Sequence, residues 1–124
     1  MIRIIDTRIA PAELAELCRA HYDTMVKFVA DVEQEILAAG GELHSDAEAL
    51  LLEQGSQQGD LWGGNFYPWK EPDQRIEFTS FINIRPADEN PSMEVLDAGN
   101  RTRIVALIEK LLLPTRETMP EAVA

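Results

Sequence analysis

The stretch from residue 40 to residue 48, Gly-Gly-Glu-Leu-His-Ser-Asp-Ala-Glu, is the part of the sequence that most constrains the fold. If the preceding segment is helical, the two glycines would cap its C-terminus. Polar residues then occupy every second position, and they include one of the two histidines of the chain: Glu42, His44, Asp46 and Glu48. We expect the chain to be organised around this stretch and look for a functional site beside it.

The segment before it, residues 25–44, allows two interpretations. As a helix, it places apolar residues at helical spacing, namely Met25, Val29, Val32, Ile36 and Ala39. As a hairpin with its turn at Glu33-Gln34, it pairs Phe28 with Ala39 and Ala30 with Leu37. Glu-Gln is poor turn chemistry, so the pattern alone leaves both interpretations open.

Apolar periodicity predicts three other helices. The first covers residues 11–22, with a proline in the first turn, where its missing N–H costs nothing. The second covers residues 46–54, and Ser45 with Glu48 forms a capping box at its start. The third begins near residue 97 or 100 and stops before the proline at 114.

Three strands are predicted outside the ambiguous segment. Residues 2–5 suggest a short first strand, and residues 76–85 alternate between apolar and polar side chains. A partner strand before residue 68 would place Phe66 opposite Phe78, which matches large apolar groups across the ladder. The other face of this hairpin then carries polar side chains: Asn65, Tyr67, Glu77, Asn83 and Arg85.

The charge of the chain limits its partners. It has 22 acidic and 11 basic side chains, a net charge of −11. Nucleic-acid binding requires basic surface that displaces counterions from phosphates, so this partner and anionic membranes are disfavoured. No apolar run approaches the roughly 18 residues of a membrane helix, the N-terminus lacks a signal-peptide core, and the single Cys18 suits a reducing compartment. We expect a cytoplasmic protein.

Three motifs occur together in this chain: Gly-Glu-Leu-His-x-Asp-x-Glu at residues 41–48, Leu-Trp-Gly-x-Asn-x-Tyr-Pro at residues 61–68, and Ile-Asn-Ile-Arg-Pro at residues 82–86. In this combination the chain resembles a family of short prokaryotic proteins known only as a domain of unknown function. The resemblance implies a shared fold and no particular reaction. It also implies valine-rich segments across residues 26–44, which favours the hairpin, and often a larger apolar residue where Gly64 stands here.

With the hairpin, the element order becomes β-α-β-β-α-β-β-α. It predicts one α+β domain over residues 1–113, with a mainly antiparallel sheet of about five strands and helices packed on one face. The alternative is that residues 25–39 are helical. Residues 114–124 have no periodic face, and we expect them to be a disordered tail.

The predicted strands bring polar residues to one face. If residues 35–44 form a strand, Glu42 and His44 share a face with Lys27 and Asp31, because side chains alternate along a strand. With both hairpins in one sheet, the predicted ligand-binding residues are Lys27, Asp31, Asn65, Tyr67, Asn83 and Arg85. An arginine on a strand suits carboxylate capture, so we expect a small anionic or carboxylate ligand.

Three classes of function follow. The favoured class is a small-ligand binding or regulatory module that uses this polar sheet face. The second is a small hydrolase or isomerase, in which His44 acts as acid or base with Glu42 and Glu77, or binds a divalent metal with Glu42 and Asp46. The third is a homodimeric interaction module, since the strands at the edges of the sheet need cover. The sequence leaves open whether the protein is an enzyme.

Overall fold

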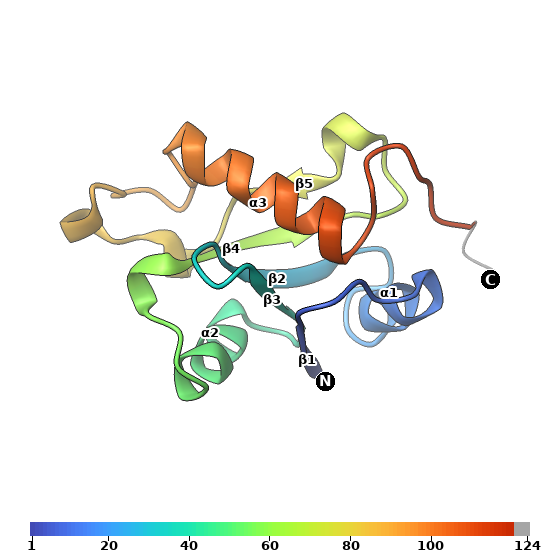
Figure 1. The fold of residues 1–124 in the computed structure, drawn as a ribbon, viewed down its shortest axis with the longest axis horizontal. Coiled ribbons are helices and arrows are strands. Elements are labelled where there is room, and N and C mark those ends of the chain that lie inside the picture. Colours follow the sequence, from blue (N-terminus) through green and yellow to red (C-terminus); the bar gives the residue numbers. More distant parts are fainter. Residues whose placement is uncertain (121–124) are drawn as a thin grey trace.

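A computed structural model describes residues 1–120 of the chain, which form a five-stranded antiparallel sheet and three α-helices (Figure 1). The strands follow the order β1-β3-β2-β4-β5 across the sheet, with β1 Ile2–Ile5, β2 Val26–Asp31, β3 Ile36–Gly40, β4 Leu61–Phe66 and β5 Ile76–Glu77. The helices are α1 Pro11–Arg19, α2 His44–Glu53 and α3 Ala98–Leu111. This confirms the predicted α+β domain, and the strands β2 and β3 rule out the helical interpretation of residues 25–39.

The hairpin of β2 and β3 has the predicted register, with Phe28 opposite Ala39 and Ala30 opposite Leu37. Its turn depends on the fully buried Asp31. One carboxylate oxygen of Asp31 accepts hydrogen bonds from the Glu33 and Gln34 main-chain N–H groups, at 3.0 and 2.9 Å. The Asp31 side chain therefore supplies the turn chemistry that Glu33-Gln34 itself lacks.

The sheet is covered on both faces. Phe28 and Ala30 belong to the core cluster that includes residues of α1 and α3, whereas Val29 belongs to the cluster that includes residues of α2. Figure 1 shows α3 on one side of the sheet and α2 on the other. The prediction that the helices pack on one face is therefore wrong. A strand buried on both faces is apolar at successive positions, as residues 28–30 are.

The second hairpin is shorter than predicted. Only Ile76–Glu77 forms a strand, and it pairs Phe66 with Ile76 instead of with Phe78. This register differs by two residues from the predicted one, so each side chain keeps its expected face. After Glu77 the chain pairs with residues 94 and 95 instead of β4: Thr79 forms a bridge with Glu94, and the Val95 N–H donates to the Phe78 carbonyl at 2.9 Å. Ser80 then caps a 3₁₀ turn, Phe81–Asn83, by accepting a 3.2 Å bond from the Ile82 N–H.

Two helix starts differ in how they are capped. Asp97 caps α3, accepting a 2.8 Å hydrogen bond from the Asn100 N–H, as one of the two predicted starts requires. Helix α2 begins earlier than predicted, after Leu43, and no side chain caps it. Because Ser45 already lies within this helix, the predicted capping box with Glu48 does not form.

Residues 114–120 belong to the segment that we expected to be a disordered tail, and in the structure they lie against the domain. The Arg75 side chain is buried and donates hydrogen bonds to main-chain carbonyls on both sides, including Lys70 at 3.1 Å and Glu117 at 2.7 Å. The Trp69 indole N–H donates to the Pro120 carbonyl at 2.8 Å, and Met119 is buried. The remaining part of the predicted tail, residues 121–124, lies outside the described residues.

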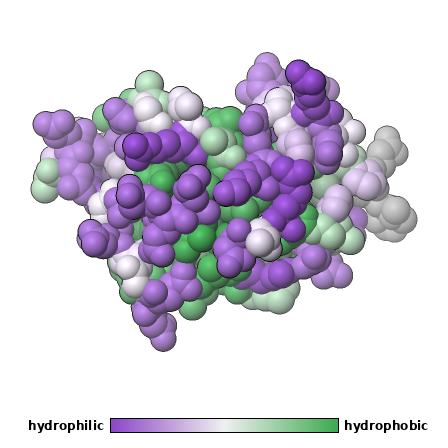
Figure 2. Space-filling model, in the orientation of Figure 1, coloured by the Kyte–Doolittle hydropathy of each residue, from purple (hydrophilic) through white to green (hydrophobic). Residues whose placement is uncertain are grey.

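The surface is mainly polar. Hydrophilic side chains cover most of the face seen in Figure 2, with hydrophobic surface between them. Across residues 1–120, none of the helices combines the length and the apolar character that crossing a bilayer would require.

Gly64 of β4 offers a test of the sheet packing. It pairs with Phe28, and a methyl group added at Gly64 would lie 2.4 Å from the Glu77 carbonyl oxygen and 2.6 Å from the Phe28 ring. We expect Gly64→Ala to lower the free energy of unfolding by about 1–3 kcal/mol, because the neighbours must shift. Urea denaturation measures this. The control Gly59→Ala, which meets no atom within 4 Å, should change stability little; equal midpoints for the two variants would contradict the packing.

Candidate functional site

A hollow of about 290 Å³ opens where the first turn of α2 meets the polar end of the sheet. We call it the Lys27 pocket. Lys27 of β2 and the first residues of α2 contribute to its wall, and the loop after β5 closes the other side. The residues that line it are Tyr22, Lys27, Glu42, Leu43, His44, Ser45, Ser80, Phe81 and Ile82.

A row of polar residues crosses the sheet beside this pocket. Lys27 of β2 lies opposite Asn65 of β4, and Asn65 lies opposite Glu77 of β5. The Asn65 amide donates to a Glu77 carboxylate oxygen at 3.1 Å, and the Tyr67 hydroxyl donates to the same oxygen at 2.7 Å. The structure thus brings together three of the six predicted ligand-binding residues and one predicted catalytic residue.

These hydrogen bonds determine the charges in the row. The bond between Tyr67 and Glu77 raises the pKa of Tyr67 to about 12 and lowers the pKa of Glu77. Glu77 is therefore a carboxylate near neutral pH and cannot supply a proton there. It serves as an acceptor that is already engaged by Tyr67 and Asn65.

Lys27 carries a positive charge that is only partly solvated. Burial lowers its pKa, and the charge of Glu77 partly offsets this effect. None of the ion pairs found within residues 1–120 includes Lys27. Its ammonium nitrogen instead lies 5.3 Å from the centre of the Tyr22 ring, a cation–π contact.

His44 is buried at the start of α2 and is fixed by the main chain. Its Nε2 lies 2.7 Å from the Gly64 carbonyl oxygen, and because a carbonyl only accepts, Nε2 carries the proton. Burial is the main cause that lowers the pKa of His44, and the charge of Lys27 acts in the same direction. His44 is therefore neutral at pH 7.

The predicted pairing of His44 with Glu42 does not form. Strand β3 ends at Gly40, and Gly40 and Gly41 have φ angles of 111° and 80°, which turn the chain before residue 42. The expected strand over residues 35–44 is therefore too long. The Glu42 carboxylate lies 3.8 Å from His21 Nδ1, and within residues 1–120 it makes no hydrogen bond or ion pair with His44.

The predicted metal ligands are not assembled. Within residues 1–120, no three His, Cys, Asp or Glu side chains lie close enough to one another to hold a metal ion. Asp46 is exposed in the first turn of α2, whereas His44 is buried there. The structure thus provides no ligand set that combines His44, Glu42 and Asp46.

The other three predicted ligand-binding residues lie elsewhere and have structural partners. Asp31 lies opposite Leu61, at the far end of β4 from Asn65. Asn83 is fully buried. Its side chain accepts a 2.8 Å hydrogen bond from the Gly63 N–H and donates a 2.9 Å bond to the Gly63 carbonyl, as a neighbouring strand would. Arg85 donates to the Leu61 carbonyl at 2.9 Å and stacks 4.2 Å above the Trp62 ring.

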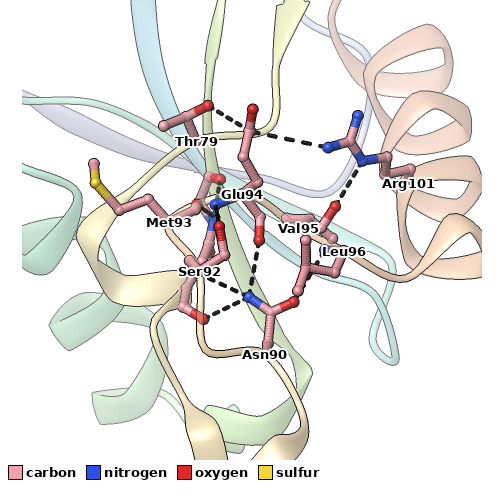
Figure 3. Close-up of polar contacts among 10 residues, drawn as sticks. Thr79, Asn90, Ser92, Met93, Glu94, Val95, Leu96 and Arg101 are labelled. Atoms are coloured by element: carbon pink, nitrogen blue, oxygen red, sulfur yellow. Dashed lines mark hydrogen bonds and ion pairs between the residues drawn. The ribbon is translucent and has the colours of Figure 1, made fainter.

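The loop after Arg85 is held together by Asn90 (Figure 3). The Asn90 amide nitrogen lies 3.0 Å from the Ser92 carbonyl oxygen and 2.9 Å from that of Glu94, and its Oδ1 accepts a 3.0 Å bond from the Leu96 N–H. The structure shows the Asn90 side chain bonding within the loop.

Sequence reasoning missed the apolar mouth of the Lys27 pocket. Phe81 is 77% exposed and Leu43 is 58% exposed, and both line the hollow. The available signal was the position of Phe81 in residues 76–85, where an aromatic residue interrupts the polar face. Leu43 gave no signal, because its exposure depends on where α2 begins.

A second hollow, of about 430 Å³, lies between α3 and the strands β4 and β5. Its walls are mainly apolar and include Phe66, Ile76, Phe78 and Ile108. It contains none of the predicted site residues. The polar groups of the candidate site therefore lie in the Lys27 pocket and in the row beside it.

Asn90 provides a test of the loop. Asn90→Asp removes the amide donor and places a carboxylate against main-chain oxygens in a site that is 3% exposed. We expect it to lower the free energy of unfolding by about 3 kcal/mol or more, measured by urea denaturation. Asn100→Asp makes the same chemical change in the first turn of α3, where a negative charge is favourable. Similar losses in both variants would contradict the role of Asn90.

The lowered pKa of His44 makes the stability of the protein depend on pH. This pKa is below 6.5 in the folded protein, so as the pH falls through 6.5 the unfolded chain binds more protons than the folded protein does. Stability should therefore decline below pH 6.5, and His44→Gln should reduce the decline. Urea denaturation on either side of pH 6.5 measures this. His21→Gln removes the exposed histidine instead and should keep the decline; an equally steep decline in His44→Gln would contradict the assignment.

Comparisons with known proteins agree with the resemblance noted in the motifs. Neither the curated proteins nor the solved structures gave a match to this chain. One family matches residues 3–111, which is most of the chain. The chain belongs to the family described as "Protein of unknown function (DUF5674)".

Proposed function

We propose that this protein is a small-ligand binding module, of a kind suited to regulation, and that it takes a carboxylate in the Lys27 pocket. The observation that carries the proposal is the state of Lys27. Its ammonium group lines a hollow of ligand size, is partly buried, and has no ion-pair partner within residues 1–120. A bound carboxylate would supply the missing counter-ion.

The groups around Lys27 favour an anion. No side chain caps the N-terminus of α2, and the positive end of its dipole attracts negative charge, although the Asp46 N–H already donates to the Leu43 carbonyl at 3.2 Å. The hydroxyl-bearing residues Ser45 and Ser80 also line the pocket and can donate hydrogen bonds. Lys27, the helix start and these hydroxyls are the donor set that a carboxylate uses.

The acidic surface does not oppose this arrangement strongly. Glu42 also lines the pocket, but its side chain is 77% exposed and its carboxylate lies beside His21, at 3.8 Å. Its charge is therefore screened by water and salt. The charge of Lys27 acts in a less polar environment, where electrostatic interactions are stronger. Glu77 is engaged by Tyr67 and Asn65.

The arrangement supports binding more than acid–base catalysis. The His44 Nε2–H donates a hydrogen bond to the Gly64 carbonyl, and His44 does not pair with a carboxylate. Glu77 is bonded to Tyr67, and Glu42 lies by His21. The predicted catalytic residues are thus each committed to a separate partner.

Titration with carboxylates tests the proposal. We expect acetate, succinate, benzoate or phenylacetate to shift the amide resonances of Lys27 and of the start of α2 in nitrogen-15 NMR spectra, with sodium chloride at equal ionic strength as the reference. Lys27→Met should weaken binding about tenfold or more, because a charged hydrogen bond is lost.

Two variants serve as controls. Lys27→Arg keeps the charge and should retain part of the affinity. Lys70→Met removes a lysine that stacks on the Tyr67 ring and does not line the pocket, so it should bind as the original protein does. If no carboxylate binds, or if Lys27→Met binds as well as the original protein, the proposed function is wrong.

A further inference from the structure

Two large apolar side chains stand uncovered at the mouth of the Lys27 pocket. Phe81 is 77% exposed and Leu43 is 58% exposed. Scattered exposed apolar residues need no explanation. These two line the same hollow as a partly buried ammonium group, and a ligand pocket combines apolar walls with a few polar groups in this way.

The main chain at both residues is held in place. Phe81 begins a 3₁₀ turn that Ser80 caps and that Asn83 attaches to Gly63 of β4. Leu43 precedes His44, whose ring is bonded to the Gly64 carbonyl at 2.7 Å. Both apolar side chains are therefore presented from fixed positions, which reduces the ordering that a ligand must bring about.

We propose that the ligand of the Lys27 pocket is a small monocarboxylic acid with an apolar body, such as an arylalkyl acid. Its carboxylate would pair with Lys27, and its apolar body would lie against Leu43 and Phe81. This inference rests on the proposed function and adds the class of ligand. A second charge on the ligand would have to face this apolar mouth or the carboxylate of Glu42.

The size of the hollow agrees with a small acid. Its volume of about 290 Å³ is at the lower limit of the usual range for ligand pockets, roughly 300–1,000 Å³. Tyr22 forms part of the wall, and its hydroxyl donates to the Glu42 carbonyl, which connects the segment before β2 to the segment before α2. Tyr22 and Glu42 thus bound part of the hollow.

A matched set of ligands separates the two parts of the inference. Phenylacetate has both a carboxylate and a ring. Acetate keeps only the carboxylate, and the neutral analogue phenylethanol keeps only the ring. We expect phenylacetate to bind at least about tenfold more tightly than acetate, because the ring buries apolar surface. It should also bind more tightly than phenylethanol, which cannot pair with Lys27. Dissociation constants come from NMR titrations of the full chain.

Variants of the mouth locate the ring. Phe81→Ala should weaken phenylacetate binding about fivefold and leave acetate binding unchanged. Leu96→Ala is the control, since Leu96 is 54% exposed and does not line this pocket. Phe81 is exposed, so its replacement should not impair folding, which circular dichroism checks.

The outcomes distinguish this inference from the proposed function. If acetate and phenylacetate bind with equal affinity and the binding of both requires Lys27, the proposed function stands and the proposal that the ligand has an apolar body is wrong. The same holds if phenylacetate binds equally well to Phe81→Ala. If no acid binds, the proposed function fails and this inference fails with it.

Discussion

The candidate site depends on the position of one charged residue, Lys27, in the central strand of the sheet. Strand β2 lies at the centre of the sheet, and every residue of it is buried except Lys27, which is partly exposed. Helices cover both faces of the sheet, and the Lys27 side chain lines the hollow at the first turn of α2. The position of Lys27 in this strand therefore determines where a site can form.

The residues around Lys27 pair with one another, and within residues 1–120 none of them forms an ion pair with it. Glu77 is opposite Asn65 in the same row, yet its carboxylate accepts hydrogen bonds from Asn65 and Tyr67 and makes no ion pair with Lys27. His44 is held by the main chain of Gly64. A partly buried charge without an ion-pair partner is costly in a structural role, and under the proposed function a bound carboxylate would complete the pair.

Much of the sheet could be predicted from local patterns, because matching apolar residues fixed the register of Phe28 with Ala39. Alternation likewise put Lys27, Asn65 and Glu77 on one face. What could not be predicted depends on bonds between side chains and distant main-chain groups. Asn83 replaces a strand beside Gly63, and Arg75 holds residues 114–117. No periodicity in the sequence records such bonds.

The pKa of the Lys27 ammonium group is the most direct measure of the central claim, namely that this charge is partly buried and lacks a partner. Heteronuclear NMR of the Lys27 side chain in alkaline solution can follow it with and without phenylacetate. The account predicts a pKa below 10.5 in the free protein and a higher pKa when the acid is bound. A pKa at or above 10.5 in the free protein, with no response to phenylacetate, would contradict it.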